Sequence, residues 1–349
     1  MSRHHGWGQG RKLSVQPHRA IMNSWVVVVL AAAGVLAPAG TAAASGPARL
    51  DAARTTPPAT AAAAVASGRI AFSQWDLLPG GNLAGHSNVY TISPDGTGRR
   101  QLTHVGAAQA AGAPDWSADG AKIVYMSNQT GDYRIWVMNS DGSAQTRLAD
   151  DPGFADLDPA WSPDGTRILF SRCDDHVGFI LACDLEVMNA AGGGMRRLAG
   201  GHWTYVRGQY SPDGRRIVVG ADRGGLLSGL WVLRSDGTGL HRITRPSLEA
   251  FFPGWSPDGR RIVFTDNCCQ GGSNIWTVRP DGTGLRELTH FVAPLQDGFA
   301  SYSPDGQRIV LLASKCCQYF YVMNANGSGL HPVRTGVPFT FLTDWGRAG

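Results

Sequence analysis

The chain has 349 residues, of which 43% are hydrophobic and 17% charged, with 46 glycines and a net charge of +4. This length is enough for a large buried core, and many glycines with few charges favour an all-β protein rich in turns. Four basic residues among the first 44 account for the whole net charge: Arg3, Arg11, Lys12 and Arg19. The remainder is neutral, so we expect no nucleic-acid partner.

The first 44 residues have the three parts of an export signal. A basic stretch precedes an apolar run of 13 residues, Trp25 to Ala37, and small residues follow at 42–44. A membrane span needs roughly 17–25 residues, so a retained anchor is the alternative to cleavage. We predict a signal peptide over 1–44, a flexible linker rich in Ala, Pro and Thr over 45–67, and no membrane span after cleavage. The mature protein is expected to be monomeric and exported, that is secreted, periplasmic or associated with the cell envelope.

From residue 68 onward, an aromatic residue followed by a turn of the Ser-Pro-Asp-Gly type recurs every 43 to 49 residues. The aromatic residues are Trp116, Trp161, Tyr210, Trp255 and Tyr302, and Trp345 follows at the same spacing in a truncated copy. This period fits one four-stranded blade of a β-propeller. We expect the aromatic residues to pack between blades.

Each copy predicts four strands. In the copy around Trp255 they cover 252–256, 261–265, 274–278 and 285–289. The earliest copy has strands at 69–73, 89–92 and 100–103 but lacks an innermost strand, which the segment 342–345 supplies. Five full copies and one shared copy predict an all-β fold for 68–349. This fold is a six-bladed β-propeller of four-stranded antiparallel blades, closed by the C-terminal strand.

Two segments carry a family resemblance: Trp161-Ser-Pro-Asp-Gly-Thr-Arg-Ile-Leu-Phe and Ile135-Trp-Val-Met-Asn-Ser-Asp-Gly. They resemble the WD40-like PD40 repeats of TolB-like propellers, over about 69–346. TolB proteins carry a further N-terminal α/β domain, and only the linker occupies that place here. In similar prolyl-oligopeptidase-like proteins a hydrolase domain follows the propeller, and this chain has no room for one. The resemblance therefore implies a TolB-like propeller that lacks the N-terminal TolB domain.

The connections divide into two faces. The turn face carries the Asp-Gly turns, which join the first strand of a blade to the second and the third to the fourth. The loop face carries the longer, irregular connections, where binding residues usually lie. Aromatic and basic residues on this face are our candidate ligand-binding set: His202, Trp203, Tyr205, Arg207, Phe251 and Phe252. Such side chains can stack on sugars or hold a peptide, and packing onto neighbouring blades is the alternative.

All six cysteines lie on the loop face. Cys173 and Cys183 stand at the two ends of one hairpin connection, which predicts a disulfide between them. The remaining cysteines form two adjacent pairs at nearly equivalent positions, Cys268 with Cys269 and Cys316 with Cys317. These pairs could form cross-bridges, vicinal disulfides or a thiolate metal cluster. An even count in an exported chain favours disulfides.

Acidic residues gather in two consecutive connections of the loop face. The first holds Asp150, Asp151, Asp156 and Asp158, and the second holds Asp174, Asp175 and Asp184. Ca²⁺ takes six to eight oxygen ligands, so this cluster is a candidate calcium site, and a solvated acidic loop is the alternative. Calcium is the one cofactor that the sequence suggests.

Common catalytic motifs are absent from the sequence: there is no nucleophile elbow, no zinc-protease helix motif and no phosphate-binding loop. We therefore predict a non-enzymatic exported scaffold that binds a protein, peptide or glycan partner at the loop face. The alternative is a metal-assisted polysaccharide lyase or hydrolase with a site at the central channel.

Overall fold

The computed structural model describes residues 68–77, 83–174, 182–201, 203–223, 229–266, 273–291, 296–314, 318–333 and 340–346. Within these ranges no helix is both long enough and apolar enough to cross a membrane. The residues assigned to the predicted signal peptide and linker lie outside the described ranges.

The described residues form twenty-four strands. In the first half they are β1 (Arg69–Leu77), β2 (Leu83–Ile92), β3 (Arg100–Gln101), β4 (Ala111–Trp116), β5 (Lys122–Ser127), β6 (Arg134–Asn139), β7 (Thr146–Arg147), β8 (Phe154–Trp161), β9 (Arg167–Asp174), β10 (Cys183–Asn189), β11 (Arg196–Ala199) and β12 (Thr204–Tyr210). In the second half they are β13 (Arg216–Asp222), β14 (Gly229–Arg234), β15 (His241–Arg242), β16 (Ala250–Trp255), β17 (Ile262–Asp266), β18 (Ile275–Val278), β19 (Arg286–Glu287), β20 (Gln296–Tyr302), β21 (Arg308–Ser314), β22 (Gln318–Asn324), β23 (His331–Pro332) and β24 (Thr340–Gly346).

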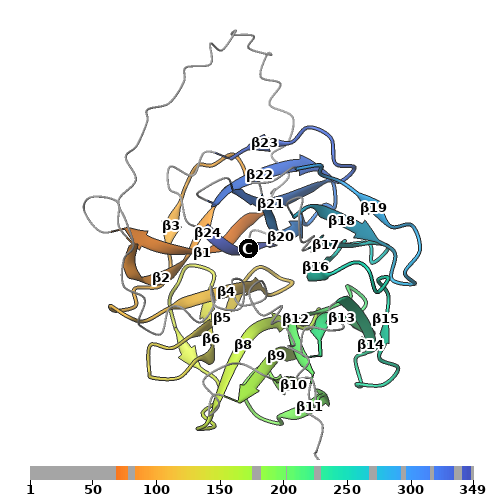
Figure 1. The fold of residues 1–349 in the computed structure, drawn as a ribbon. Coiled ribbons are helices and arrows are strands. Elements are labelled where there is room, and N and C mark those ends of the chain that lie inside the picture. Colours follow the sequence, from red (N-terminus) through yellow and green to blue (C-terminus); the bar gives the residue numbers. More distant parts are fainter. Residues whose placement is uncertain are drawn as a thin grey trace, which may run out of the picture.

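The sheets are arranged around a common axis, as in a β-propeller (Figure 1). Four sheets have four strands each, in the orders β24-β1-β2-β3, β4-β5-β6-β7, β16-β17-β18-β19 and β20-β21-β22-β23. The inner wall consists of β24, β4, β8, β12, β16 and β20, and each of these strands contacts the next around the ring. The predicted all-β propeller of antiparallel four-stranded blades is confirmed.

Strand β24 closes the ring by completing the first sheet. It pairs antiparallel with β1, so that Trp345 lies opposite Ile70 and Thr343 lies opposite Phe72. Backbone groups of β1 that would otherwise form an open sheet edge are thereby paired. The predicted closure by the C-terminal strand is confirmed.

The prediction of six separate blade sheets needs correction. Strands β8 to β15 form one eight-stranded sheet, because β10 pairs in parallel with β12 at a single position, Cys183 opposite Thr204. The backbone amide of Cys183 donates a hydrogen bond to the Trp203 carbonyl at 3.1 Å. Hydrogen bonding therefore gives four four-stranded sheets and one eight-stranded sheet.

The fourth strand of a repeat is shorter than the sequence predicts. In the repeat around Trp255 the predicted strand over 285–289 is reduced to β19, two residues long. Most other outermost strands are equally short, such as β7 and β15. An outermost strand has one neighbour, and a short edge strand limits pairing with other chains.

A serine and an aspartate fix each turn that follows the repeat aromatic. In the turn after Trp255, the Ser256 hydroxyl donates to Asp258 Oδ1 at 2.6 Å and accepts from the Arg261 backbone amide at 2.9 Å. Gly259 has φ +67°, a conformation that a β-carbon disfavours. The Ser-Pro-Asp-Gly sequence is thus a turn motif with a structural role.

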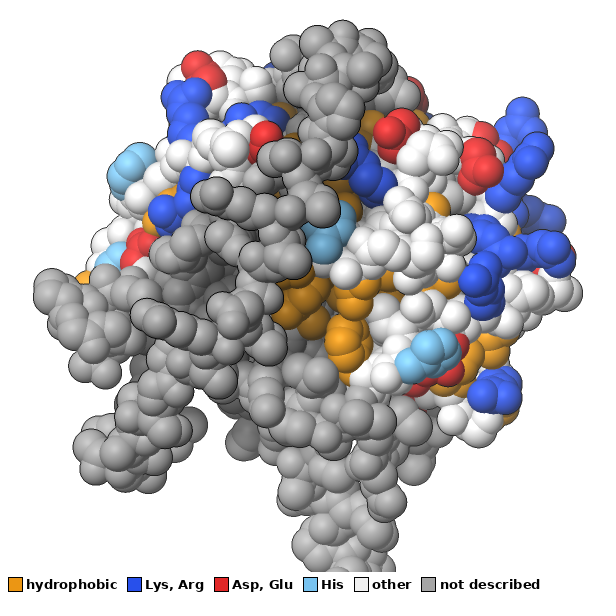
Figure 2. Space-filling view, turned by 90° about the horizontal axis from the view of Figure 1, so that it is seen from above, with side chains coloured by type: hydrophobic (Ala, Val, Ile, Leu, Met, Phe, Trp, Pro, Cys, Tyr) orange, Lys and Arg blue, Asp and Glu red, His pale blue; other side chains and the backbone are white. Residues whose placement is uncertain are grey.

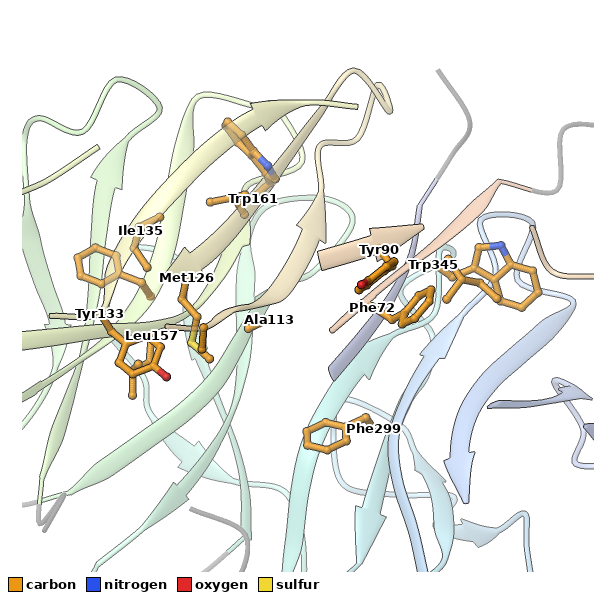
Figure 3. Packing of buried hydrophobic residues seen from close by; sticks show 14 of the residues in the cluster. Phe72, Tyr90, Ala113, Met126, Tyr133, Ile135, Leu157, Trp161, Phe299 and Trp345 are labelled. Atoms are coloured by element: carbon orange, nitrogen blue, oxygen red, sulfur yellow. The ribbon is translucent and has the colours of Figure 1, made fainter. Parts of the chain in front are cut away.

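The repeat aromatics are buried, as predicted. Relative exposure ranges from 3% for Trp345 to 8% for Trp161, Tyr210 and Trp255. The largest core cluster draws residues from several sheets, among them Phe72, Ile135 and Trp161 (Figure 3). Within it, the ring centroid of Phe72 on β1 lies 4.9 Å from that of Phe320 on β22, in an edge-to-face arrangement. Burial of such apolar surface between adjacent sheets is the main favourable contribution to the fold.

Candidate functional site at the ring axis

Five of the inner strands carry a β-bulge at an equivalent position. The pairing register shifts in the middle of β4, β8, β12, β16 and β20. One residue in each shift has positive φ: Ala113, Asp158, Arg207, Phe252 and Phe299, with values from 48° to 54°. A β-bulge of this kind turns a side chain away from the regular alternation. Non-glycine residues at positive φ cost energy and often accompany functional sites.

Two aspartates link neighbouring inner strands. Asp115 of β4 accepts a hydrogen bond from the Trp161 backbone amide at 2.7 Å. Asp344 of β24 accepts one from the Trp116 amide at 3.0 Å and another from the Ser301 hydroxyl at 3.2 Å. Burial raises the pKa of the Asp115 carboxyl well above its usual range, and the nearby Asp344 charge raises it further. Burial likewise raises the pKa of Asp344.

A third aspartate faces an arginine across a gap. Asp158 Oδ1 lies 3.9 Å from Nη1 of Arg207, and the side chains are 10% and 12% exposed. This distance is too long for a hydrogen bond. Burial raises the pKa of the Asp158 carboxyl, and the Arg207 charge opposes that shift. We call Asp115, Asp158, Arg207 and Asp344 the axial cluster.

A small cavity lies beside three residues of the axial cluster: Asp115, Asp158 and Arg207. It has a volume of about 10 Å³ and is lined by Pro114, Asp115, Asp158, Pro159, Ala160, Arg207, Gly208 and Gln209, from β4, β8 and β12. This volume is about that of one water-sized group. The cavity is therefore polar on the side of the carboxylates and apolar at the prolines.

Aromatic side chains border the cluster on the side of β16 and β20. The rings of Phe252 and Phe299 have centroids 4.2 Å apart, and Phe251 lies 6.2 Å from Phe252. The Arg207 guanidinium stands 5.7 Å from the Phe299 ring centroid. Phe251 and Phe252 are only partly buried, so this apolar group stays accessible beside the charged one.

The predicted ligand-binding residues separate into two groups. Arg207, Phe251 and Phe252 lie at or beside the axial cluster. Trp203 instead stacks with Tyr205 and meets Trp231 edge to face, with centroids 6.2 Å and 5.0 Å away. Tyr205 is only 1% exposed, so it packs in the core, which is the alternative that the sequence left open. His202 lies outside the described residues.

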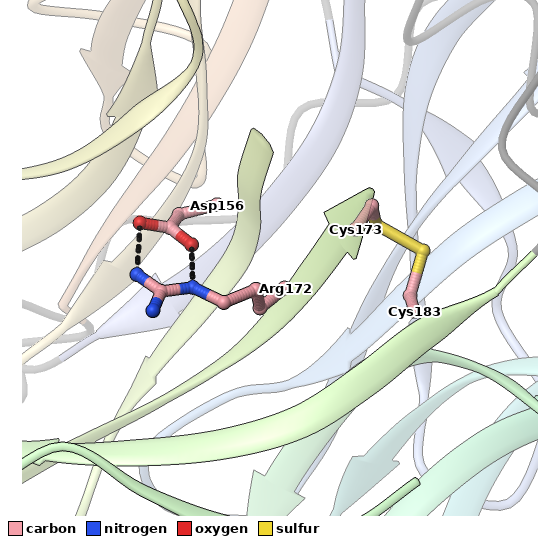
Figure 4. The surroundings of a disulfide bond; sticks show 4 residues. All are labelled: Asp156, Arg172, Cys173 and Cys183. Carbon is pink, nitrogen blue, oxygen red and sulfur yellow. Dashed lines mark hydrogen bonds and ion pairs between the residues drawn. A yellow bond between two sulfur atoms is a disulfide. The ribbon is translucent and has the colours of Figure 1, made fainter. Parts of the chain in front are cut away.

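The acids proposed for calcium are held by arginines. Arg172 donates to both carboxylate oxygens of Asp156, at 2.7 and 3.0 Å (Figure 4). It also donates to Asp151 at 2.8 Å. Arg147 binds Asp150 at 2.7 Å. Over the described ranges, no three His, Cys, Asp or Glu side chains are grouped closely enough to hold a metal ion. Asp174 is exposed on β9 and Asp175 lies outside the described residues, so the calcium site stays an untested prediction without a donor set in this part of the chain.

The disulfide between Cys173 and Cys183 is confirmed. These cysteines lie directly opposite each other on β9 and β10, and their side chains are buried (Figure 4). Cys268, Cys269, Cys316 and Cys317 lie outside the described residues.

A larger cavity, of about 720 Å³, opens on the turn face between β13 and β14. Its lining includes Arg216 and Arg234, but both are engaged within the turn face. Arg216 lies 5.1 Å from the Trp255 ring centroid, and Arg234 donates to the Thr238 hydroxyl at 3.3 Å. We therefore place the candidate site at the axis, where a buried carboxylate oxygen lacks a partner among the described residues.

Asp115 and Asp344 were missed by sequence reasoning. Both directly precede a repeat aromatic, where the other copies have Ala160, Gln209, Gly254 and Ser301. That difference between copies was the available signal, since all of these positions lie on inner strands.

The fold and the site define a β-propeller whose charged groups converge at the axis. A model of the PD40 family, described as the TolB beta propeller domain, matches residues 83–225. The resemblance to TolB-like PD40 propellers is thus confirmed, and the family model covers less than half of the chain.

Individual relatives agree with this assignment. An uncharacterized protein of Agrobacterium fabrum is 34% identical over 134 residues, which cover 36% of this chain and 44% of that protein. The Tol-Pal system protein TolB of Albidiferax ferrireducens is 29% identical over 109 residues, which cover 30% of this chain and 25% of that protein. The matched regions thus span less than half of either relative.

Solved structures show the same fold. TolB from Acinetobacter baumannii superposes with a TM-score of 0.65 at 20% identity, covering 80% of this chain and 67% of that one. An oligogalacturonate lyase from Vibrio parahaemolyticus superposes with a TM-score of 0.53 at 14% identity, covering 76% of this chain and 79% of that one. At these identities the likeness concerns the fold alone.

Proposed function

We propose that the chain is an exported, non-enzymatic propeller that binds a protein or peptide partner over the axial cluster and the adjacent phenylalanines. The supporting observation is that the largely buried axial cluster lies beside the partly exposed Phe251 and Phe252, at a bulge repeated along the inner wall. Aromatic anchors next to charged groups are typical of binding hot spots. The TolB relative is named as a Tol-Pal system protein, and for this reason we favour a protein partner over a glycan.

The proposal includes six blades. Strands β8–β11 and β12–β15 count as two blades, since the single Cys183–Thr204 pair joins them. Each set repeats the strand order of the four-stranded sheets. An experimental density map with a different number of repeats around the axis would contradict this count.

Export is proposed from the leader and from the disulfide. Basic, apolar and small-residue parts at 1–44 fit a cleaved signal, with a linker over 45–67 and the propeller over 68–349. The Cys173–Cys183 disulfide fits an oxidising compartment. Mass spectrometry of the exported protein should find an amino terminus near Ser45, and retention of the full leader would contradict cleavage.

The binding face can be tested by affinity capture from an extract of the source cells. Phe251→Ala and Phe252→Ala should each lose the captured partner, because the side chains supply the apolar contact. The matched control is Leu330→Ala, since Leu330 is an exposed apolar residue on the turn face at 37% exposure. A thermal melt establishes that each variant is folded. Unchanged capture by both folded phenylalanine variants would reject this face.

The enzymatic alternative is a polysaccharide lyase or hydrolase at the axis. It is supported by the fold-level likeness to an oligogalacturonate lyase and by the raised pKa of Asp158, which would suit a general base. A screen with uronate-containing glycans, together with elemental analysis of the purified chain, separates the two functions. Turnover that is lost in Asp158→Asn would favour the enzyme.

A further inference from the structure

We propose that the axial cluster receives a primary ammonium group, carried by a lysine side chain or by the amino terminus of the bound peptide. This inference rests on the proposed binding function and specifies the chemistry that the site recognises. The charge balance, an unpartnered oxygen and the size of the cavity all support it.

The charge balance favours a cation. Three carboxylates, Asp115, Asp158 and Asp344, share the field of one guanidinium, Arg207. Buried carboxylates without sufficient positive charge are costly. One added ammonium group would reduce this excess of negative charge.

An unpartnered oxygen indicates where the ammonium would bind. Asp158 Oδ1 is buried and makes no hydrogen bond to any described residue. The carboxylate accepts a bond from the Arg207 backbone amide, yet the Arg207 guanidinium stays 3.9 Å away. An ammonium group has three donors and no acceptor. It can therefore donate to Asp158 and still reach a second oxygen.

The size of the cavity selects among cations. A volume of about 10 Å³ admits a water-sized head group, whereas a planar guanidinium is larger and needs a fork of acceptors. A calcium ion would need six to eight oxygens. The described carboxylates are not grouped for a metal ion. A primary ammonium is the cation that fits best.

Apolar side chains border the cavity and the neighbouring Arg207. Pro114 and Pro159 line it, and the Phe252–Phe299 pair lies beside Arg207. The methylene stem of a lysine can lie along such surfaces while its head reaches the acids. The aromatic and acidic parts of the site would thus contact different parts of one ligand side chain.

The test uses the full chain and defined peptides. The first probe is acetyl-Gly-Ala-Lys-Ala-Gly-amide, and its control has Nε-acetyl-lysine. A second probe replaces the lysine by alanine and leaves the amino terminus free. Calorimetry should show at least one amine probe binding at least about tenfold more tightly than the acetylated control, because acetylation removes the charge. The better of the two probes identifies the source of the ammonium.

Asp158→Asn should weaken binding of that probe at least about tenfold, because it removes the charge that the ammonium faces. Asparagine tolerates positive φ, so this variant should keep its fold. Asp281→Asn, in an exposed turn on the turn face, is the matched control and should bind like the wild type. Affinity should also rise with pH, because burial raises the pKa of the Asp115, Asp158 and Asp344 carboxyls and their ionisation adds the negative charge that attracts an ammonium group.

Equal binding of the amine and acetylated probes, no binding of either amine probe, or unchanged binding in Asp158→Asn would overturn the ammonium site. A water-filled cavity would give these results. If capture from the extract still depended on Phe251 and Phe252, the binding face would stand without the ammonium site. If capture were also independent of the phenylalanines, the proposed function would fail as well.

Discussion

At the scale of single residues, aspartates in this molecule have two opposite environments. Turn aspartates such as Asp213 accept bonds from a serine hydroxyl and a backbone amide, which hold their pKa below the usual range. Axial aspartates such as Asp115 are buried beside another carboxylate, which raises their pKa. The same residue type therefore stabilises the turns in the ionised form and is costly in that form at the axis.

Replacement of a turn serine should destabilise the fold. Ser211 is fully buried, donates to Asp213 at 2.5 Å and accepts from the Arg216 amide at 3.0 Å. Ser211→Ala removes both hydrogen bonds and leaves the Arg216 amide without this acceptor, whereas Asp213 keeps the bond from the Arg215 amide. We expect a loss of about 1–3 kcal/mol in the free energy of unfolding, measured by denaturant unfolding. Ser235→Ala, in the other turn of the same repeat, is the control, because it lies in a turn without this serine–aspartate pair. Equal losses of unfolding free energy in the two variants would contradict a stabilising role for the hydrogen bonds of Ser211.

Replacement of an axial acid should stabilise the fold at neutral pH. Because the pKa of Asp115 is raised above 3.8 in the folded protein, its protonated form contributes stability below that pH. This contribution is lost as the pH rises through the folded pKa. An asparagine at this position does not titrate and can still accept from the Trp161 amide. Asp115→Asn should therefore melt at a higher temperature than the wild type at neutral pH, with the advantage disappearing in acid below 3.8.

Asp305→Asn provides the control of opposite sign. The Ser303 hydroxyl lowers the pKa of Asp305, so its contribution is present at neutral pH and is lost in acid. This variant should melt at a lower temperature than the wild type at neutral pH. A melting temperature that falls in Asp115→Asn at neutral pH would show that its charge is compensated in the free protein.

The sequence predicts the role of a residue well when that residue recurs in every repeat, and poorly when it occurs in only one or two repeats. Burial of Trp116 and Trp161 follows from their place in each copy. The roles of Asp115 and Asp344 depend on which inner strands are neighbours around the ring, through contacts between residues distant in sequence. The ligand-binding roles predicted for Trp203 and Tyr205 rest on residue type alone, whereas Trp203 packs against Trp231 from another strand.

At the scale of elements, the β9–β10 hairpin combines two constraints. The disulfide joins Cys173 to Cys183, and Cys183 also carries the single pairing to β12. The disulfide was predictable because its cysteines flank one connection. The parallel pairing was not, since Thr204 belongs to the following repeat and no side-chain pattern marks it.

Removal of this disulfide should lower stability. It spans 10 residues in sequence, and closing a loop of this size in the unfolded chain corresponds to about 3 kcal/mol. The double variant Cys173→Ala/Cys183→Ala should therefore melt several degrees below the wild type, measured by calorimetry under oxidising conditions. Each single variant should lose a similar amount. An unchanged melting temperature in the double variant would show that strand pairing alone fixes the hairpin.

At the scale of the whole molecule, the propeller depends on the pairing of β1 with β24. The repeat spacing predicts this closure, because the series has an incomplete copy at each end, and these two copies together supply the strands of one sheet. The spacing could not predict that two repeats share hydrogen bonds in one eight-stranded sheet. The number of sequence repeats can be counted directly, whereas the hydrogen bonds between two repeats depend on their arrangement in space.

Deletion of 340–349 should open the ring. The chain would lose the buried Trp345 and the acceptor that Asp344 provides for the Trp116 amide. It would also expose an unpaired β1 edge, so we expect a large drop in melting temperature and self-association, measured by calorimetry and light scattering. Deletion of 347–349 alone is the control, because it leaves every described strand in place. Equal heat resistance and solubility of both deletions would contradict closure by β24.

Closure by β24 also determines when folding can finish. During synthesis β1 emerges early, whereas the strand that completes its sheet emerges after every other strand of the ring. Contacts between such distant parts of a chain form slowly. A chain that is still being synthesised, or that ends before β24, therefore cannot close the ring, even if its other sheets are correctly folded. Until β24 is in place, the edge of β1 stays unpaired and can pair with a strand of a neighbouring molecule.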